Sequence, residues 1–173
     1  MFLIIRPVRL VFKALVTEAT PGQLALGFAL GVLVGLVPKG NLLAIALGIV
    51  LAASRANLGI AAATILVFSF ISPWFDPASD YIGTWLLSLP SMQQTWTDLY
   101  NTPLMPWTSF NNSIVMGSFI LGVLLLYPNY RLSRPVFEKY TQKLSVWSRR
   151  YRITRYLLGA ELVGLVNSND SGS

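Results

Sequence analysis

The chain has 173 residues, the length of a single domain; 54% of them are hydrophobic, and the mean hydropathy is +0.58. This composition indicates an integral membrane protein and leaves no room for a large soluble domain. Cysteine and histidine are absent, which excludes disulfides, thiolate sites and most zinc and hydrolase chemistry. No metal or other cofactor is expected.

Residues 1–19 predict an amphipathic helix that lies in the membrane interface. Arg6, Arg9 and Lys13 share one face at helical spacing, and most of the remaining residues are apolar. A signal peptide has a similar pattern, but the next helix begins with a cap of its own. No cleavage is therefore expected.

Residues 20–57 predict a helical hairpin on which the rest of the interpretation depends. Residues 20–23 form a capping box with Pro21 at the first helical position, and a long apolar run follows. Asn41 is placed to cap a second apolar helix that ends near Ala53. Small residues recur at every fourth position of both helices, which predicts that the two arms pack closely on each other. These residues are Gly27, Gly31, Gly35, Ala44, Gly48 and Ala52.

The two apolar runs are short for a membrane crossing. They reach about 21 and 18 Å, whereas the hydrocarbon core of a bilayer is about 30 Å thick. Either polar flanks extend the hairpin across the bilayer, or the hairpin is re-entrant and turns inside it at residues 38–41. Lys39 then either snorkels to the outer headgroups or is held inside by a carboxylate, a carbonyl or a lipid headgroup.

Residues 58–71 predict a spanning helix that ends at Ser72-Pro73. Asp76-Pro77 resembles the start of a new helix, with Asp76 as its N-cap and Asp80 one turn later. Two carboxylates at this spacing either bind a cation or only stabilise a helix start. The second interpretation is favoured, because Asp is common at helix starts for that reason alone.

From Trp74 to Trp107, aromatic residues alternate with Pro, Ser and Thr, which predicts short amphipathic pieces in an aromatic belt at the outer interface. Residues 111–113 can then cap a last spanning segment, residues 114–127. Gly117 and Gly122 are its small contact positions.

The tail, residues 131–166, predicts a basic amphipathic helix with aromatic residues on one face, and residues 167–173 predict a disordered end. Basic residues among aromatics also occur in RNA-binding segments. The charge distribution favours a membrane: no Lys or Arg lies between Ala56 and Tyr130, where Asp76, Asp80 and Asp98 are found. The positive-inside rule places both termini in the cytoplasm and the acidic middle outside. Nucleic acid is not the expected partner.

These segments together predict an all-α integral membrane protein. A glycine-rich hairpin, either full or re-entrant, and two further spanning helices form a membrane domain of residues 20–130, flanked by amphipathic interfacial helices. The candidates for contact with a lipid or another ligand are polar and turn-forming residues: Pro38, Lys39, Gly40, Asn41, Arg55, Asn57, Asp76 and Asp80. No residue is assigned a catalytic role.

Residues 25–31, 35–38 and 55–57, with a proline after the third apolar segment, carry a family resemblance. Over residues 20–130 the chain resembles a family of uncharacterised bacterial membrane proteins, domain of unknown function 2062. An Asn usually precedes that proline in the family, and Ser72 stands here, so no role of the Asn is carried over. The corner at residues 38–41 and Asp76-Pro77 are similar to a Gram-negative subfamily often encoded beside an elongated, lipid-transfer-like envelope protein. The resemblance implies the inner membrane and an envelope partner, and it supplies no catalytic residue.

Three functional hypotheses follow. The first is a non-enzymatic inner-membrane component of an envelope assembly that supports lipid transfer to a periplasmic partner. Its partners are membrane lipids and either another envelope protein or further copies of the chain. The second is a small carrier, channel or scramblase with its path at residues 38–41, although few ionisable groups lie at membrane depth. The third is an enzyme acting on lipid, with Asp76, Asp80 or Asp98 as its only candidate acids.

Overall fold

A computed structural model describes residues 19–150, and the side chains of residues 19–140. Residues 1–18 and 151–173 lie outside the described residues. They include nearly all of the predicted interfacial helix, the second part of the predicted tail and the predicted disordered end. Every regular element within the described range is helical. The elements are α2 (Pro21–Leu36), α3 (Leu42–Ala53), α4 (Leu58–Leu87), η1 (Pro90–Met92), α5 (Gln93–Tyr100), η2 (Met105–Thr108) and α6 (Ser113–Arg150).

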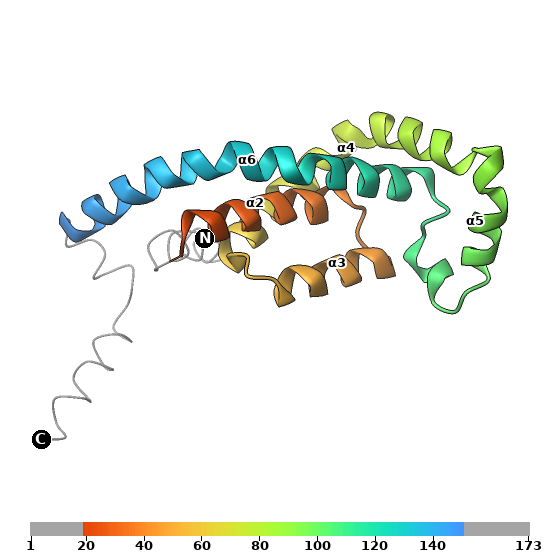
Figure 1. Ribbon diagram of the computed structural model, residues 1–173, viewed down its shortest axis with the longest axis horizontal. Coiled ribbons are helices and arrows are strands. Elements are labelled where there is room, and N and C mark those ends of the chain that lie inside the picture. Colours follow the sequence, from red (N-terminus) through yellow and green to blue (C-terminus); the bar gives the residue numbers. More distant parts are fainter. Residues whose placement is uncertain (1–18, 151–173) are drawn as a thin grey trace, which may run out of the picture.

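Helix α2 is the centre of the molecule, and it packs against both α4 and α6, which also pack on each other (Figure 1). Its Leu24, Ala25 and Ala29 are 0% exposed. The predicted capping box is confirmed: the Gln23 N–H donates to Thr20 Oγ1 at 3.3 Å, and the Thr20 N–H donates to Gln23 Oε1 at 2.9 Å. A three-helix core of α2, α4 and α6 therefore carries the fold.

Gly27, Gly31 and Gly35 of α2 face α4 and its N-cap residue, Asn57. A Cβ at Gly27 would lie 2.5 Å from the Asn57 carbonyl oxygen, and a Cβ at Gly35 would lie 2.5 Å from the Cβ of Phe68. The sequence predicted instead that the small residues of the hairpin would pack its two arms together. Around Gly48 of α3, an added Cβ would meet no atom within 4 Å among the described residues. The spacing of the glycines predicts that the helix has a flat face, but it does not tell which helix packs on that face. Here the partner is α4.

A second close contact joins α4 and α6. A Cβ added at Gly83 would overlap the Ser113 carbonyl oxygen, and a Cβ at Gly117 would overlap the Ser79 carbonyl oxygen. Each helix thus contributes a serine and a glycine four residues apart, which lie on one helix face. Ser79 is 1% exposed. Small residues let the two backbones touch, the arrangement that membrane helices use to pack without a hydrophobic driving force.

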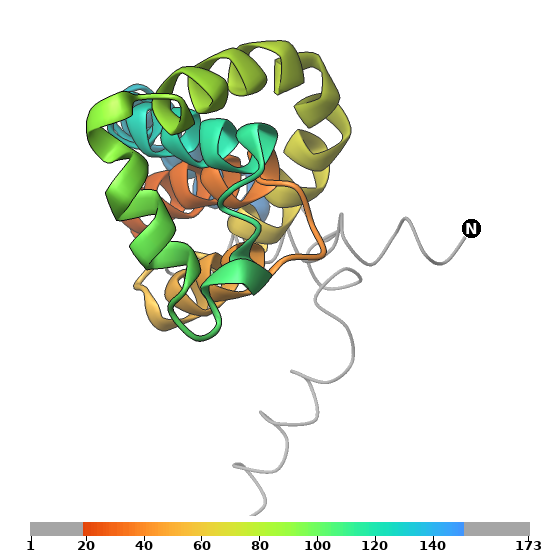
Figure 2. The same ribbon diagram turned by 90° about the vertical axis from the view of Figure 1, so that its right-hand side faces the viewer.

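Helix α4 continues through Pro73 and Pro77 for 30 residues. The predictions that it ends at Ser72-Pro73 and that Asp76 caps a new helix are therefore wrong. Pro73 cannot donate to the Ser69 carbonyl, but the Ser72 hydroxyl donates to that carbonyl at 3.2 Å instead. The α4 ribbon bends along its course in Figure 2, as expected for a helix that contains proline.

Helix α6 likewise runs through Pro128 and Pro135, so the predicted boundary between membrane domain and tail at residues 130 and 131 falls inside one helix. Phe137, predicted on the aromatic face of a separate tail, packs against Phe28 of α2 with ring centroids 6.5 Å apart. The first part of the tail is therefore an extension of the core.

Two described helices, α4 and α6, are long and apolar enough to cross a membrane, judged by length and composition. Helices α2 and α3, with 16 and 12 residues, are apolar but shorter. The fold thus combines two long helices with a short hairpin, as the sequence predicted.

The α4–α6 contact generates a test of the fold. Gly117→Ala forces a methyl group into the Ser79 carbonyl, and overpacking of this kind costs about 1–3 kcal/mol. Gly48→Ala is the matched control, because its methyl group meets open space and alanine is favoured over glycine within a helix by about 1 kcal/mol. Thermal unfolding followed by circular dichroism in one detergent should show a lower midpoint for Gly117→Ala only. Equal midpoints for the two variants would contradict the contact.

Candidate functional site

The candidate residues do not form one cluster. The corner at residues 38–41 lies at the end of the molecule that carries α5, whereas Arg55 and Asn57 follow α3 at the opposite end (Figure 1). The 12 residues of α3 separate the two places by about 18 Å. Each place is therefore described on its own.

Lys39 is bound by the end of α2. Its Nζ donates to the carbonyl oxygens of Val34 at 2.7 Å, Gly35 at 3.0 Å and Val37 at 2.6 Å. An ammonium group has three donors, and these bonds use all of them. The positive charge also lies at a helix C-terminus, which the helix dipole favours. Lys39 is therefore a cap of α2 with no donor left for a ligand.

Asn41 holds the other half of the corner. Its Nδ2 donates to the Pro38 carbonyl at 2.9 Å, and its Oδ1 accepts from the Ala44 N–H at 2.8 Å. The predicted cap of α3 is thus confirmed, and the side chain is 7% exposed. Gly40 has φ +94°, a backbone conformation that only glycine adopts readily. The four corner residues form a tight turn that joins α2 to α3.

Asn57 starts α4 and docks it on α2. Its Oδ1 accepts from the Ile60 N–H at 3.0 Å, and its own N–H donates to the Gln23 carbonyl at 2.9 Å. Gly27 lies directly opposite, where it leaves room for the Asn57 backbone. Arg55 is exposed, and its side chain has no partner among the described residues. A structural role therefore accounts for Asn57.

Asp76 and Asp80 lie one turn apart within α4. Asp80 accepts a hydrogen bond from the Ser113 hydroxyl, and Ser113 is the first residue of α6, where a negative charge is favoured. Asn112 Oδ1 caps the same helix, accepting from the Val115 N–H at 3.2 Å, as predicted. Asp80 thus stabilises the start of α6, a role that the sequence assigned to a different helix.

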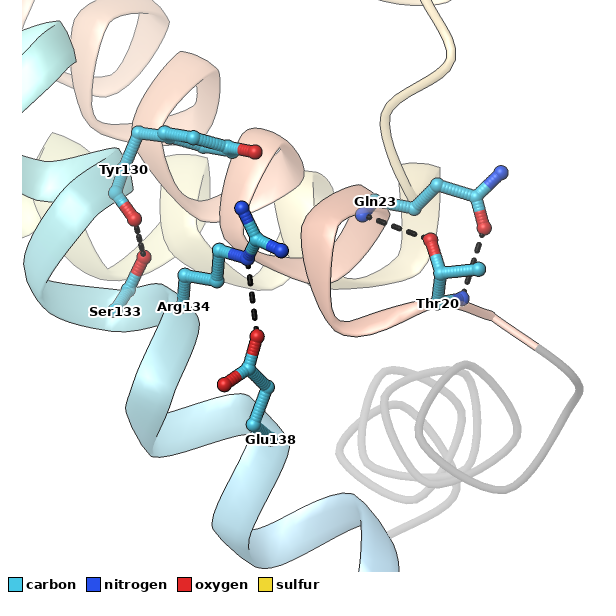
Figure 3. A network of polar contacts seen from close by, with 6 residues as sticks. All are labelled: Thr20, Gln23, Tyr130, Ser133, Arg134 and Glu138. Atoms are coloured by element: carbon cyan, nitrogen blue, oxygen red, sulfur yellow. Dashed lines mark hydrogen bonds and ion pairs between the residues drawn. The ribbon is translucent and has the colours of Figure 1, made fainter.

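The polar side chains at the start of α2 lie beside α6 (Figure 3). Arg134 Nε and Glu138 Oε1 form an ion pair at 3.0 Å, with both side chains about half exposed, so it contributes little to stability. Tyr130 reaches across to α2, where a Cβ at Gly22 would lie 3.6 Å from its hydroxyl oxygen. The figure draws one polar end of the molecule: Thr20, Gln23, Tyr130, Ser133, Arg134 and Glu138.

An apolar cavity of about 460 Å³ lies next to the corner, between the start of α3, the η2 loop and α6. Leu42 and Leu43, which directly follow the corner, form one wall, and Met116 and Phe119 of α6 form another. Sequence reasoning missed this cavity, because η2 begins more than fifty positions after the end of α3 and has no motif that places it there. A second, more polar cavity of about 350 Å³ lies beside α5 and is lined in part by Gln93, Trp96 and Thr97.

Comparison with known proteins identifies relatives of the chain. The sequence model of a family described as uncharacterized protein conserved in bacteria (DUF2062) matches residues 7–145. An uncharacterized protein of Treponema pallidum (strain Nichols) is 32% identical over 136 residues, which are 79% of this chain and 84% of that protein. No solved structure matches.

The role of Lys39 as a cap leads to a stability prediction. Lys39→Met leaves three carbonyl groups without their donor, and an unsatisfied group costs about 1–3 kcal/mol. Lys139→Met is the matched control, because Lys139 is exposed and has no partner among the described residues. Detergent-solubilised Lys39→Met should unfold at a lower temperature than wild type, while the control unfolds with wild type. Unchanged unfolding of Lys39→Met would leave the lysine free for another role.

Proposed function

The chain belongs to the bacterial family named domain of unknown function 2062, and for it we propose a non-enzymatic role in the inner membrane. It is an integral, multi-pass component of an envelope assembly that supports the transfer of lipid to a periplasmic partner. The family match and the relative in Treponema confirm the resemblance found in the sequence. The proposal beyond the family rests on the surface and cavities of the molecule.

The observation that carries the proposal is the exposed apolar surface of α3 and α4. Ile49 of α3 is 64% exposed, and Phe70 and Trp74 of α4 are 79% and 84% exposed. Large apolar side chains exposed in such number along two helices are typical of contact with a membrane or a partner. Lipid chains would cover both helices and thereby avoid the free-energy cost of exposing their apolar side chains to water.

The distribution of polar groups supports an orientation in the membrane. Arg134 and Lys139 lie on α6 at the polar end of the molecule, whereas Asp98 lies on α5 at the other end. The positive-inside rule then puts the polar end in the cytoplasm. Helix α4 has 30 residues and reaches about 45 Å, enough to cross with some tilt.

The hairpin of α2 and α3 fits a re-entrant arrangement. Its helices of 16 and 12 residues reach about 24 and 18 Å, less than the hydrocarbon thickness of about 30 Å. A lysine at membrane depth is costly unless it is satisfied, and three carbonyls satisfy Lys39. The corner can therefore lie below the headgroups without leaving an ammonium donor unsatisfied.

The same contacts favour lipid support over the alternative of a carrier, channel or scramblase with its path at the corner. Such a path needs free polar groups or charges that line it. Lys39 donates to three carbonyls at the end of α2, and Asn41 donates to the Pro38 carbonyl of the corner. The adjacent cavity is apolar and suits hydrocarbon better than an ion or a polar solute.

Crosslinking in living cells tests the proposed assembly. After crosslinking, extraction in mild detergent and affinity purification, the full chain is expected to be recovered with another envelope protein or with further copies of itself. Recovery of the protein alone and monomeric would defeat the assembly. Lipid scrambling by the purified chain alone in proteoliposomes would instead support the alternative.

Cysteine labelling tests the depth of the corner, and the chain has no native cysteine to interfere. Pro38→Cys is preferred to a change at Gly40, because Gly40 has φ +94°. The control is Gln94→Cys on α5, where the residue is exposed. A membrane-impermeant maleimide applied to intact spheroplasts should label Gln94→Cys fast and Pro38→Cys at least about ten-fold more slowly, because the hydrocarbon excludes the reagent. Equal rates would rule out the re-entrant arrangement.

A further inference from the structure

The cavity between α3 and η2 has walls from three separate parts of the chain. Leu42 and Ala46 come from α3, Leu104 and Met105 come from the η2 loop, and Met116 comes from α6. Helix α3 and η2 contact each other directly and lie side by side in Figures 1 and 2. At about 460 Å³, the cavity falls within the range of about 300–1,000 Å³ that is usual for small-molecule sites.

The side chains that line the cavity are almost entirely apolar and offer a ligand no free hydrogen-bond donor. No charged side chain lines the cavity. The one hydroxyl, that of Thr108, donates to the Met105 carbonyl at 2.6 Å, so its proton is already used. Burial of a polar group without a hydrogen bond is unfavourable. The cavity therefore selects hydrocarbon.

The η2 loop is held in an uncommon conformation. Leu104 and Ser109, which flank η2, have φ +71° and +56°, the left-handed region that non-glycine residues seldom adopt. Strained backbone of this kind is concentrated at ligand sites and functional loops. Leu104 is 67% exposed and lines the cavity, so this conformation shapes the wall and mouth of the cavity.

The cavity is also continuous with the surface that the proposed function places against lipid. Ala46 lines it and is exposed, and its neighbours Ile45 and Ile49 are 59% and 64% exposed on the same helix. An occupant that arrives from the bilayer can therefore enter beside α3 without crossing water. Among apolar occupants, lipid acyl chains are the ones that a bilayer supplies in excess.

We propose that this cavity binds one acyl chain of a bilayer phospholipid, between Ala46 of α3 and Leu104 of the η2 loop. The proposal rests on the membrane location in the proposed function, and it makes that function more specific. One chain of a lipid leaves the bilayer and lies against the protein beside the corner. Such a lipid is partly withdrawn from its neighbours, the state in which a partner can take it up.

Photolabelling tests the site directly. The full-length chain is mixed with a phosphatidylethanolamine that carries a diazirine in one acyl chain, in detergent micelles, and is illuminated, digested and analysed by mass spectrometry. The adducts are expected on the peptides that carry Leu104 and Met116. Ala46→Trp should lower them about ten-fold, because an indole takes the volume of several methylene groups that contribute to binding.

Two further variants keep the test independent of folding. Ala52→Trp is the matched control on the same helix, exposed but away from the cavity, and should label like wild type. Leu104→Asp places a carboxylate at the mouth, at an exposed position whose left-handed conformation Asp tolerates, and should also lower the labelling. Equal circular dichroism spectra of the variants show that they are folded.

Other outcomes would overturn the site. Adducts spread evenly over the exposed faces of α3 and α4, or labelling that Ala46→Trp leaves unchanged, would show that the lipid only coats the surface. Loss of a crosslinked dimer in Ala46→Trp without loss of lipid adducts would show that a second copy fills the cavity. Because the probe is delivered in micelles, this result is separate from the crosslinking and maleimide experiments. The experiments can therefore disprove the proposed assembly without disproving the lipid site, and can disprove the lipid site without disproving the assembly.

Discussion

The structure depends on the direct approach of neighbouring backbones to α2. The start of α4 comes so close to α2 that the Asn57 N–H bonds to the carbonyl of Gln23, a residue already inside a helix, and glycine at position 27 is what permits it. On the other side, Gly122 of α6 lies against Leu33. Glycine removes the side chain that would keep two helix backbones apart, so the backbones come into van der Waals contact, and a backbone hydrogen bond joins α2 to the start of α4. The position of α2 between its neighbours follows from this constraint.

The polar groups at the end of α2 form hydrogen bonds within the fold, which leaves few of them available to bind a ligand. Lys39 and Asn41 are the residues that a reader of the sequence would assign to a ligand, yet their hydrogen bonds close the end of one helix and the start of the next. Asp80 does the same for α6. Because these polar groups are already hydrogen-bonded within the fold, the surface and the cavity that remain beside the corner are apolar. A lipid function agrees with that remainder better than chemistry on a polar substrate.

The sequence allowed local features to be predicted where a few adjacent residues determine them. The caps at Thr20, Asn41 and Asn112 and the short hairpin are of this kind, because each requires contacts over only three or four positions. The prolines led to wrong predictions of where α4 ends. A hydroxyl such as that of Ser72 can replace the hydrogen-bond donor that proline lacks, so the helix continues. Composition alone does not show whether such a replacement is made. The partner of the α2 glycines and the cavity under η2 depend on which distant segments meet. The spacing of residues along the chain does not show which of these segments come into contact. The serine and glycine pairs at 79 and 83 and at 113 and 117, in contrast, could have been recognised as a packing motif.

Helix α3 differs from α2, α4 and α6 in how it is attached to the rest of the described structure. It is joined through a four-residue corner and a short turn, and its most extensive contacts are with α2 and η2. Its one buried residue, Leu51, lies in a cluster with Val34 of α2 and Ala61 of α4. A segment with so few buried contacts opens at a much lower free energy than the whole molecule unfolds. Its amide hydrogens would then exchange with solvent long before those of α2, α4 and α6, which protect one another. Within the described residues we therefore expect α3 to move more readily than the core of α2, α4 and α6, and such a movement would change the width of the cavity without disturbing that core.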